Sequence, residues 1–128
     1  MLEKDLHRLV CDYIRKLYPY VIFRTDFSSG MRMSIGMAKR HKALQYSNAY
    51  PDLFIAEPKG NYAGLFIELK TVNNVVFKKD GSMRKNTHHE EQETMMLKLR
   101  GKGYKAEFGL GFGHTIKLIN EYLNLFYH

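Results

Sequence analysis

Two charged residues interrupt a stretch of alternating apolar side chains, and this pattern constrains the fold more than any other in the chain. The stretch reads "GLFIELKT", from Gly64 to Thr71. Successive side chains of a strand point to opposite faces, so the leucines and the isoleucine share one face, and Glu68 and Lys70 share the other. Charged residues are poor strand formers and are costly to bury without partners. We therefore expect a strand whose second face holds Glu68 and Lys70 together.

An aspartate at the start of the preceding strand adds to this pattern. That strand is predicted from Asp52 to Glu57, and the turn "PKGN" joins it to the charged strand. As antiparallel neighbours, the two strands would bring Asp52 within reach of Glu68. Converging carboxylates repel each other unless a proton or a cation lies between them, and oxygen ligands suit Mg²⁺ or Mn²⁺. We therefore predict a metal site formed by Asp52, Glu68 and the backbone carbonyl of Leu69.

Lys70 gives this predicted site a chemical role. A lysine beside the cation and a phosphate can orient or deprotonate the attacking water and offset the developing negative charge. Such an assembly hydrolyses phosphodiester bonds. The alternative is structural: Asp52 caps its strand, and Glu68 and Lys70 form an ion pair on a solvated face. Short motifs of common residues occur often by chance, so the motif alone does not decide between the two.

Length, composition and charge restrict the class of protein. The chain has 128 residues, 45% of them hydrophobic, which predicts one domain spanning residues 1–128. It contains no apolar run long enough to cross a membrane, no signal-peptide core and one cysteine, features that favour a cytoplasmic location. Lys and Arg number 20 against 13 Asp and Glu, and the net charge of +7 favours a polyanionic partner.

Hydrophobic periodicity predicts the elements around the two charged strands. The expected helices cover residues 2–17, 34–45, 87–102 and 114–126, and the further strands cover residues 20–27 and 104–110. Residues 73–86 are expected to form a long polar loop. The predicted class is α/β, with a mixed central sheet flanked by helices in the order α-β-(α)-β-β-α-β-α.

Several segments resemble a known nuclease family. Pro51-Asp52 and "ELK" at Glu68 to Lys70 are similar to the PD-(D/E)xK nuclease signature, and the element order matches the α-β-β-β-α-β core of that restriction-endonuclease-like superfamily. Within it, the chain resembles the VRR-NUC family, especially its small stand-alone viral and bacterial members. The resembling segments are "SGMRMSIGMAKRHKA", "PDLFIA", "GLFIELKT", "EEQETMMLKLRGKGYKAEFGLGF" and "IKLINEYL".

The resemblance implies a metal-dependent, structure-selective DNA endonuclease. It would act as a homodimer on branched DNA such as Holliday (four-way) junctions, in a bacterial cell or a phage-infected host cell. It implies that Asp52 and Glu68 bind Mg²⁺ or Mn²⁺, that Lys70 is the catalytic lysine and that Gln92 lies at the site. Glu3 matches an acidic residue that often completes such sites, although an acid at a helix start also suits the helix dipole.

The chain departs from the family pattern in two places. "NAY" precedes Pro51-Asp52, where the family usually has a glycine, and the segment from Val72 to His89 is longer and more basic than in compact relatives. Two other functions remain as alternatives: a non-catalytic DNA-binding module on the same fold, and a restriction-type endonuclease. The intact Asp, Glu and Lys set argues against the first. No second domain for reading sequence is evident, which argues against the second.

Weaker signals lead to four further predictions. His88 and His89 diverge by about 100° on a helix, so we expect solvated histidines, of which His88 is the better candidate for a phosphate contact. Cys11 lies four residues after His7, but two ligands make no zinc site, so Cys11 is predicted to be a core residue. "GLGFGH" is predicted to be a tight turn. The Met-rich segment 31–37 is predicted to form part of a dimer interface.

Basic residues surround the predicted site in sequence and could follow a DNA backbone. The alternative is a solvated positive surface without a specific ligand. The residues are Lys39, Arg40, Lys42, Lys78, Lys79, Arg84, Lys85, Lys98, Arg100, Lys102 and Lys105.

Overall fold

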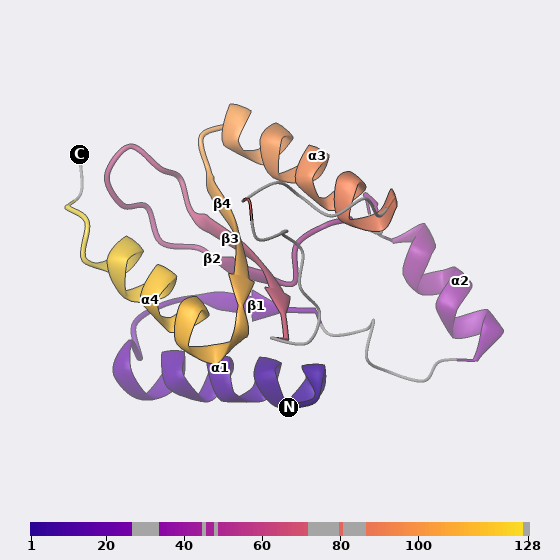
Figure 1. The fold of residues 1–128 in the computed structure, drawn as a ribbon, viewed down its shortest axis with the longest axis horizontal. Coiled ribbons are helices and arrows are strands. Elements are labelled where there is room, and N and C mark those ends of the chain that lie inside the picture. Colours follow the sequence, from indigo (N-terminus) through magenta and orange to yellow (C-terminus); the bar gives the residue numbers. More distant parts are fainter. Residues whose placement is uncertain (27–33, 45, 48, 72–79, 81–86, 127–128) are drawn as a thin grey trace.

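Helices and strands follow one another along the chain in the predicted order. The computed structural model describes residues 1–26, 34–44, 46–47, 49–71, 80 and 87–126. Its elements are α1 (Glu3–Leu17), β1 (Phe23–Thr25), α2 (Ile35–Ala43), β2 (Leu53–Ile55), β3 (Leu65–Lys70), α3 (Thr87–Gly101), β4 (Lys105–Leu110) and α4 (Gly111–Leu123) (Figure 1). Most of the predicted 73–86 loop lies outside the described residues. None of the described helices is long and apolar enough to cross a membrane.

The four strands form one mixed sheet in the order β1-β2-β3-β4. β1 pairs with β2, and β2 with β3, in antiparallel fashion. β4 pairs with β3 in parallel, because α3 carries the chain back to the start of the sheet before β4 begins. β3 therefore lies between two strands, and all six of its residues are buried.

One face of the sheet is covered by α1 and α4 (Figure 1). The helix α1 forms because its apolar residues recur at helical spacing, and Leu6, Val10 and Ile14 are fully buried against the sheet. They pack in one cluster with the side chains that β3 directs to this face. The β3 members are Leu65, Ile67 and Leu69, so the predicted core face is confirmed.

The other face of the sheet is covered by α3 (Figure 1). Phe66 belongs to this second cluster, together with Met95, Met96 and Leu99 from α3. Because Phe66, Glu68 and Lys70 alternate with the first-face residues, the charged pair of β3 emerges on the α3 side of the sheet.

Several element boundaries differ from the prediction. The strands expected over residues 20–27 and from Asp52 to Glu57 are both shorter, and their ladder joins only Phe23–Thr25 to Leu53–Ile55. α4 begins at Gly111 and not at His114, so "GLGFGH" is no separate turn. Gly111 has a φ of +82°, which permits the direct change from strand to helix.

The helix α2 projects away from the sheet (Figure 1). Its bounds, Ile35–Ala43, agree with the helix predicted near residues 34–45, although residue 45 lies outside the described part. Ile35 is 79% exposed and Met37 is 55% exposed, so the apolar residues of this helix are not used in the core. Residues 31–33 of the predicted Met-rich interface also lie outside the described part.

Candidate functional site

Asp52 and Glu68 lie across from each other on adjacent strands. Leu53 pairs with Ile67 in the antiparallel register, so the next facing pair is Asp52 and Glu68. The backbone N–H of Leu69 donates a hydrogen bond to Asp52 Oδ2 at 3.1 Å. Only 9% of Asp52 and 4% of Glu68 is exposed. The predicted antiparallel pairing is therefore confirmed, and it buries two carboxyl groups at one end of the sheet.

Lys70 lies on the same face of β3 as Glu68, one strand repeat further along. Its Nζ is 4.0 Å from Glu68 Oε1, and only 6% of the residue is exposed. An ion pair on a solvated face, the structural alternative considered for these residues, is excluded because both partners are buried. Glu68 Oε2 is also buried and accepts no hydrogen bond from the described residues. The site thus holds acceptor capacity that the described part of the chain does not use.

Burial and mutual repulsion make both carboxyl groups weak acids. Burial is the main cause that raises the pKa of Asp52 to about 6, against the lowering effect of hydrogen bonds from Glu68 and the Leu69 backbone. Burial, and then the charge of Asp52, raise the pKa of Glu68 well above its ordinary value. Lys70 lowers both pKa values but does not outweigh burial. A pair of this kind is stabilised by a shared proton or by a cation.

The first turns of α1 bring a third acidic group to this end of the sheet. Glu3 Oε1 and Asp52 Oδ2 each lie 3.8 Å from His7 Nε2, and one ligand atom from each of Glu3, His7 and Asp52 lies within 4.8 Å of the others. The side chain of Glu3 therefore lies near Asp52, and a metal-binding role for Glu3 stays a prediction. His7 is 1% exposed, and burial lowers its pKa against the effects of Glu3 and Asp26, which favours the neutral imidazole.

Sequence reasoning did not include His7 in the site. It was considered only with Cys11, which instead lies 3.6 Å from Thr25 Oγ1 and is buried, as predicted for a core residue. The available signal was the spacing between Glu3 and His7. Residues four apart lie next to each other on one face of a helix. If Glu3 is part of a site, His7 is therefore expected to lie beside that site.

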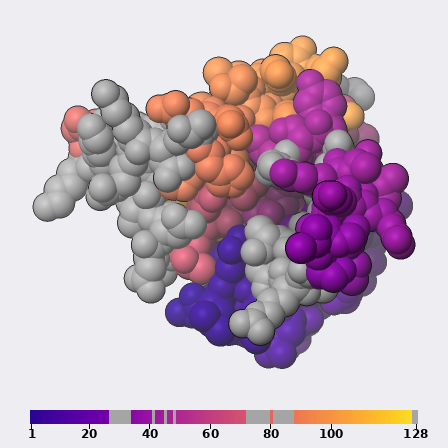
Figure 2. Space-filling model, turned by 90° about the vertical axis from the view of Figure 1, so that its right-hand side faces the viewer, coloured from indigo at the N-terminus to yellow at the C-terminus, as the bar shows by residue number. Residues whose placement is uncertain are grey.

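The start of α3 approaches the site from the other side. Gln92 is 2% exposed, and its Nε2 lies 3.2 Å from His88 Nε2. Its Oε1 accepts no hydrogen bond from the part of the chain that the structure describes. Burial, followed by the charges of Lys70 and His88, lowers the pKa of His89. Figure 2 views this end of the molecule, with α1 below α3.

One histidine prediction was wrong. His88 is exposed as expected, but His89 is only 8% exposed and faces the body of the molecule. The spacing to Gln92, Met96 and Leu99 carried the signal, because residues three, seven and ten positions apart lie on one helical stripe. Because His89 and Gln92 lie on the same stripe of α3, a buried Gln92 implies that His89 is buried too.

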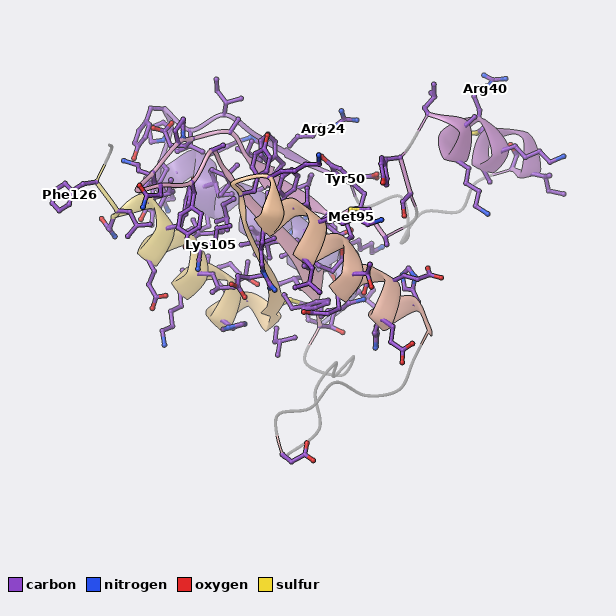
Figure 3. All side chains as sticks on the ribbon, turned by 90° about the horizontal axis from the view of Figure 1, so that it is seen from above. Arg24, Arg40, Tyr50, Met95, Lys105 and Phe126 are labelled. Atoms are coloured by element: carbon purple, nitrogen blue, oxygen red, sulfur yellow. The ribbon has the colours of Figure 1, made fainter. Side chains whose placement is uncertain are left out.

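The predicted basic surface divides into two groups where it is described. Arg100 and Lys105 are engaged within the fold: Arg100 donates to the backbone carbonyl of Ala106, and both side chains lie within 3.8 Å of Glu107 carboxylate oxygens. Lys39, Arg40 and Lys42 are exposed on α2, and Figure 3 shows Arg40 far from the sheet. Lys98 on α3 and Lys102 just after it are exposed as well. The four basic residues between positions 78 and 85 lie outside the described part.

The donor set at this end of the sheet fits a divalent cation. Asp52 and Glu68 supply buried carboxyl groups with raised pKa values, and Glu3 adds a further carboxylate near Asp52. Among the described residues, none donates a hydrogen bond to Glu68 Oε2. Carboxylate oxygens are ligands that Mg²⁺ and Mn²⁺ prefer. A cation there would relieve the repulsion between Asp52 and Glu68.

A comparison with solved structures shows which class of fold this is. The chain is similar to a structure named "VRR_NUC domain protein", with a TM-score of 0.65 and 22% sequence identity over 99% of this chain and 92% of that one. This match confirms the predicted fold class, a mixed central sheet flanked by helices, as the fold that a VRR_NUC domain protein also has. No family model and no curated protein matches the sequence.

Proposed function

We propose that this chain is a metal-dependent DNA endonuclease of the VRR-NUC family, with residues 1–128 as a single nuclease domain. The observation that carries the proposal is the buried cluster of Asp52, Glu68 and Lys70. Two carboxyl groups with raised pKa values stand beside a lysine, on a chain of net charge +7. Perturbed titratable groups of this kind are common at catalytic sites. The fold of the VRR_NUC domain protein supports the same assignment.

In this proposal, Asp52 and Glu68 hold Mg²⁺ or Mn²⁺, and the Leu69 carbonyl and Glu3 complete the ligand set. When bound, the cation supplies Lewis-acid stabilisation of the charge that develops on the phosphoryl oxygens. The hydrogen bond from the Leu69 N–H holds Oδ2 of Asp52 against the backbone of β3. The β2–β3 ladder thus sets the position of both carboxylates before substrate arrives.

Lys70 and Gln92 act on the reacting groups. Lys70 Nζ donates a hydrogen bond to a non-bridging oxygen of the scissile phosphate and stabilises its increased negative charge. The buried Gln92 Oε1 accepts a hydrogen bond from the attacking water and orients it toward phosphorus. The water oxygen bonds to phosphorus as the bond to the leaving oxygen breaks. The proton that the water loses passes to solvent, and the leaving oxygen takes up a proton from solvent. Both side chains are held by packing, so little reorganisation is needed.

The preferred substrate in this proposal is branched DNA, such as a four-way junction, and the active species is a homodimer. Two sites in one dimer can cut two strands. The exposed basic helix α2 supports contacts with the DNA backbone away from the site, and such contacts follow shape more than base sequence.

Cleavage assays test the proposal directly. Labelled four-way junction, flap and plain duplex are incubated with Mg²⁺, Mn²⁺ or EDTA, using wild type, Lys70→Met and Lys117→Met. The methionine keeps the apolar stem of Lys70 and removes its charge, while Lys117 is an exposed lysine on α4 and serves as the matched control. We expect metal-dependent cutting that falls by at least about 10²-fold in K70M and is unchanged in K117M.

The same samples separate the remaining functions, because binding is measured alongside cutting. If the protein binds DNA but cuts none of the substrates in either metal, the nuclease proposal is wrong and the chain is a DNA-binding module. Cutting of plain duplex at one sequence would instead indicate a restriction-type endonuclease.

A further inference from the structure

A hollow of about 310 Å³ opens directly beside Asp52. It lies between the ends of β1 and β2 and the segment that leads from α2 into β2. Its lining residues are Arg24, Thr25, Asp26, Leu44, Tyr46, Tyr50, Pro51, Asp52 and Phe54. Because Asp52 belongs both to this hollow and to the carboxylate site, the two adjoin each other.

The sheet register places the floor of the hollow next to the carboxylates. Arg24 pairs with Phe54 across β1 and β2, and Phe54 pairs with Phe66 across β2 and β3. These three side chains therefore form a row on the same face as Asp52 and Glu68. The two rows are two residues apart along the strands, which is about 7 Å. A group in the hollow would be a close neighbour of one bound at the carboxylates.

Aromatic rings form a rigid wall at this position. The Phe54 ring stacks on Phe66, with centroids 4.4 Å apart, and the Tyr50 ring meets Phe66 edge to face at 5.5 Å. Tyr50 remains 43% exposed although its edge is held in this cluster. Such a ring offers a pre-positioned flat surface, and its ordering entropy is already lost in the folded protein.

Tyr46 supplies a second ring, which is far more exposed. It is 77% exposed, and Lys98 Nζ from α3 lies 6.0 Å from its ring centroid. Exposed aromatic rings beside cations are the elements with which proteins bind unpaired bases, because every base has a π-face. The lining of the hollow thus combines stacking surfaces with nearby positive charge.

The charges around the hollow indicate which part of a nucleotide it would hold. Asp26 and the buried Asp52 are among its lining residues, and ionised carboxylates there would repel a phosphate. Arg24, another lining residue, is exposed, and Figure 3 shows Arg24 and Tyr50 in the region between the sheet and α2. An uncharged base therefore suits the interior, and a phosphate suits the rim near Arg24. A base within a duplex presents no free π-face, so the occupant must be unpaired.

We propose that this hollow binds one unpaired nucleobase of the DNA strand, next to the scissile phosphate. The inference rests on the proposed nuclease function and names the feature by which branched DNA is chosen over plain duplex. The base lies against Tyr46 and Tyr50, and Arg24 contacts the adjoining phosphate. Junctions, flaps and bulges supply unpaired bases, whereas plain duplex must first break a base pair.

Fluorescence of 2-aminopurine tests the proposal, and the chain contains no tryptophan that would interfere. The probe base is placed, one position at a time, in the single-stranded part of a flap and at a single-base bulge. Binding is measured in EDTA, so that the DNA stays intact, with plain duplex as the reference. The variants are Tyr46→Ala and Tyr46→Phe, with Tyr20→Ala as matched control. Tyr20 is 59% exposed and lies outside the hollow.

We expect wild type to change the probe fluorescence at one unpaired position and to bind bulged DNA more tightly than duplex. In Y46A the fluorescence change should disappear, and the ratio of affinities for bulged DNA and duplex should fall about tenfold. Y46F and Y20A should keep both the fluorescence change and the affinity ratio of wild type. No fluorescence change in wild type at any position, or an unchanged preference in Y46A, would overturn the proposal.

Parallel cleavage assays in Mn²⁺ separate the two proposals. Metal-dependent cutting without a fluorescence change would leave the nuclease in place and remove the base site. A Tyr46-dependent fluorescence change without any cutting would overturn the nuclease and retain a base-binding site.

Discussion

Replacing Asp52 by asparagine should stabilise the metal-free protein at neutral pH. Burial raises the pKa of Asp52 to about 6 in the folded state, against 3.8 for an ordinary aspartate. The folded state therefore binds this proton more tightly than the unfolded state does. The stability that this group contributes is fully present below about pH 4 and is lost as the pH rises through about 6. In D52N the amide oxygen still accepts the hydrogen bond from Leu69 N–H, so the charge is removed while the contact is kept.

The size of the effect follows from the two pKa values. Their difference, 6 − 3.8, is about two pH units, and each unit corresponds to about 1.4 kcal/mol, so ionised Asp52 destabilises the fold by about 3 kcal/mol. Roughly half of this loss is already present at pH 5. The charge of Asp52 also raises the pKa of Glu68 by repulsion. Removing that charge lessens this repulsion, which further stabilises the folded state of D52N.

Urea unfolding in EDTA measures this difference. Wild type, D52N and D12N are compared at about pH 5 and about pH 7.5. Asp12 is the matched control, because it lies on α1 with its side chain 61% exposed. We expect D52N to exceed wild type by up to about 3 kcal/mol at the higher pH and by about half as much at the lower. D12N should stay within about 0.5 kcal/mol of wild type at both.

Divalent cations should reverse this order. Excess Mn²⁺ should stabilise wild type more than D52N, because a ligand that binds only the folded state adds stability by mass action. If D52N were no more stable than wild type in EDTA at the higher pH, the burial of an uncompensated carboxylate pair would be refuted. The electrostatic argument for a cation at this site would then be lost as well.

Four further predictions concern the site and the packing beneath it. In E68Q, the rise in melting temperature that Mn²⁺ causes in wild type should disappear, as measured by thermal unfolding; an equal rise would show that Glu68 is no ligand. Gly109→Ala should destabilise by about 1–3 kcal/mol, because its Cβ would lie within 3 Å of Thr115 Oγ1 and of a β3 side chain. Gly113→Ala, with open space around it, should be neutral or stabilising by up to about 1 kcal/mol in the same denaturation assay. Tyr122→Phe should lose about 1 kcal/mol, because the Tyr122 hydroxyl donates a 2.6 Å hydrogen bond to a backbone carbonyl between β2 and β3, and equal urea midpoints would contradict this.

Local pattern was sufficient for most elements of the fold. Apolar spacing along one helix face predicts α1 and α4 to within three residues at each end, because burial of such a face decides whether a helix forms. Alternation along β3 predicts that Glu68 and Lys70 share a face. The resemblance in "PDLFIA" and "GLFIELKT" then indicates which chemistry these side chains support.

Local pattern failed where a residue's neighbours come from distant parts of the chain. The divergence of adjacent helix residues led to the prediction that His89 is solvated, yet only 8% of it is exposed in the folded chain. β1 is short because its partner β2, some 30 residues later, pairs with it over only three residues. The start of α4 at Gly111 depends on a backbone conformation that apolar spacing does not report.

The sequence by itself determined the identity of the carboxylates and the lysine, and the strand parity that puts Glu68 beside Lys70. These are short-range properties, since a strand has a fixed two-residue repeat. Only the tertiary structure decided that Glu3 and His7 reach Asp52, and that Tyr46, Tyr50 and Arg24 form a hollow beside it. Those contacts join segments separated by tens of residues, and packing of helices and loops against the sheet brings them together. Burial has the same origin: the raised pKa values of Asp52 and Glu68 arise because the assembled fold removes both carboxyl groups from water.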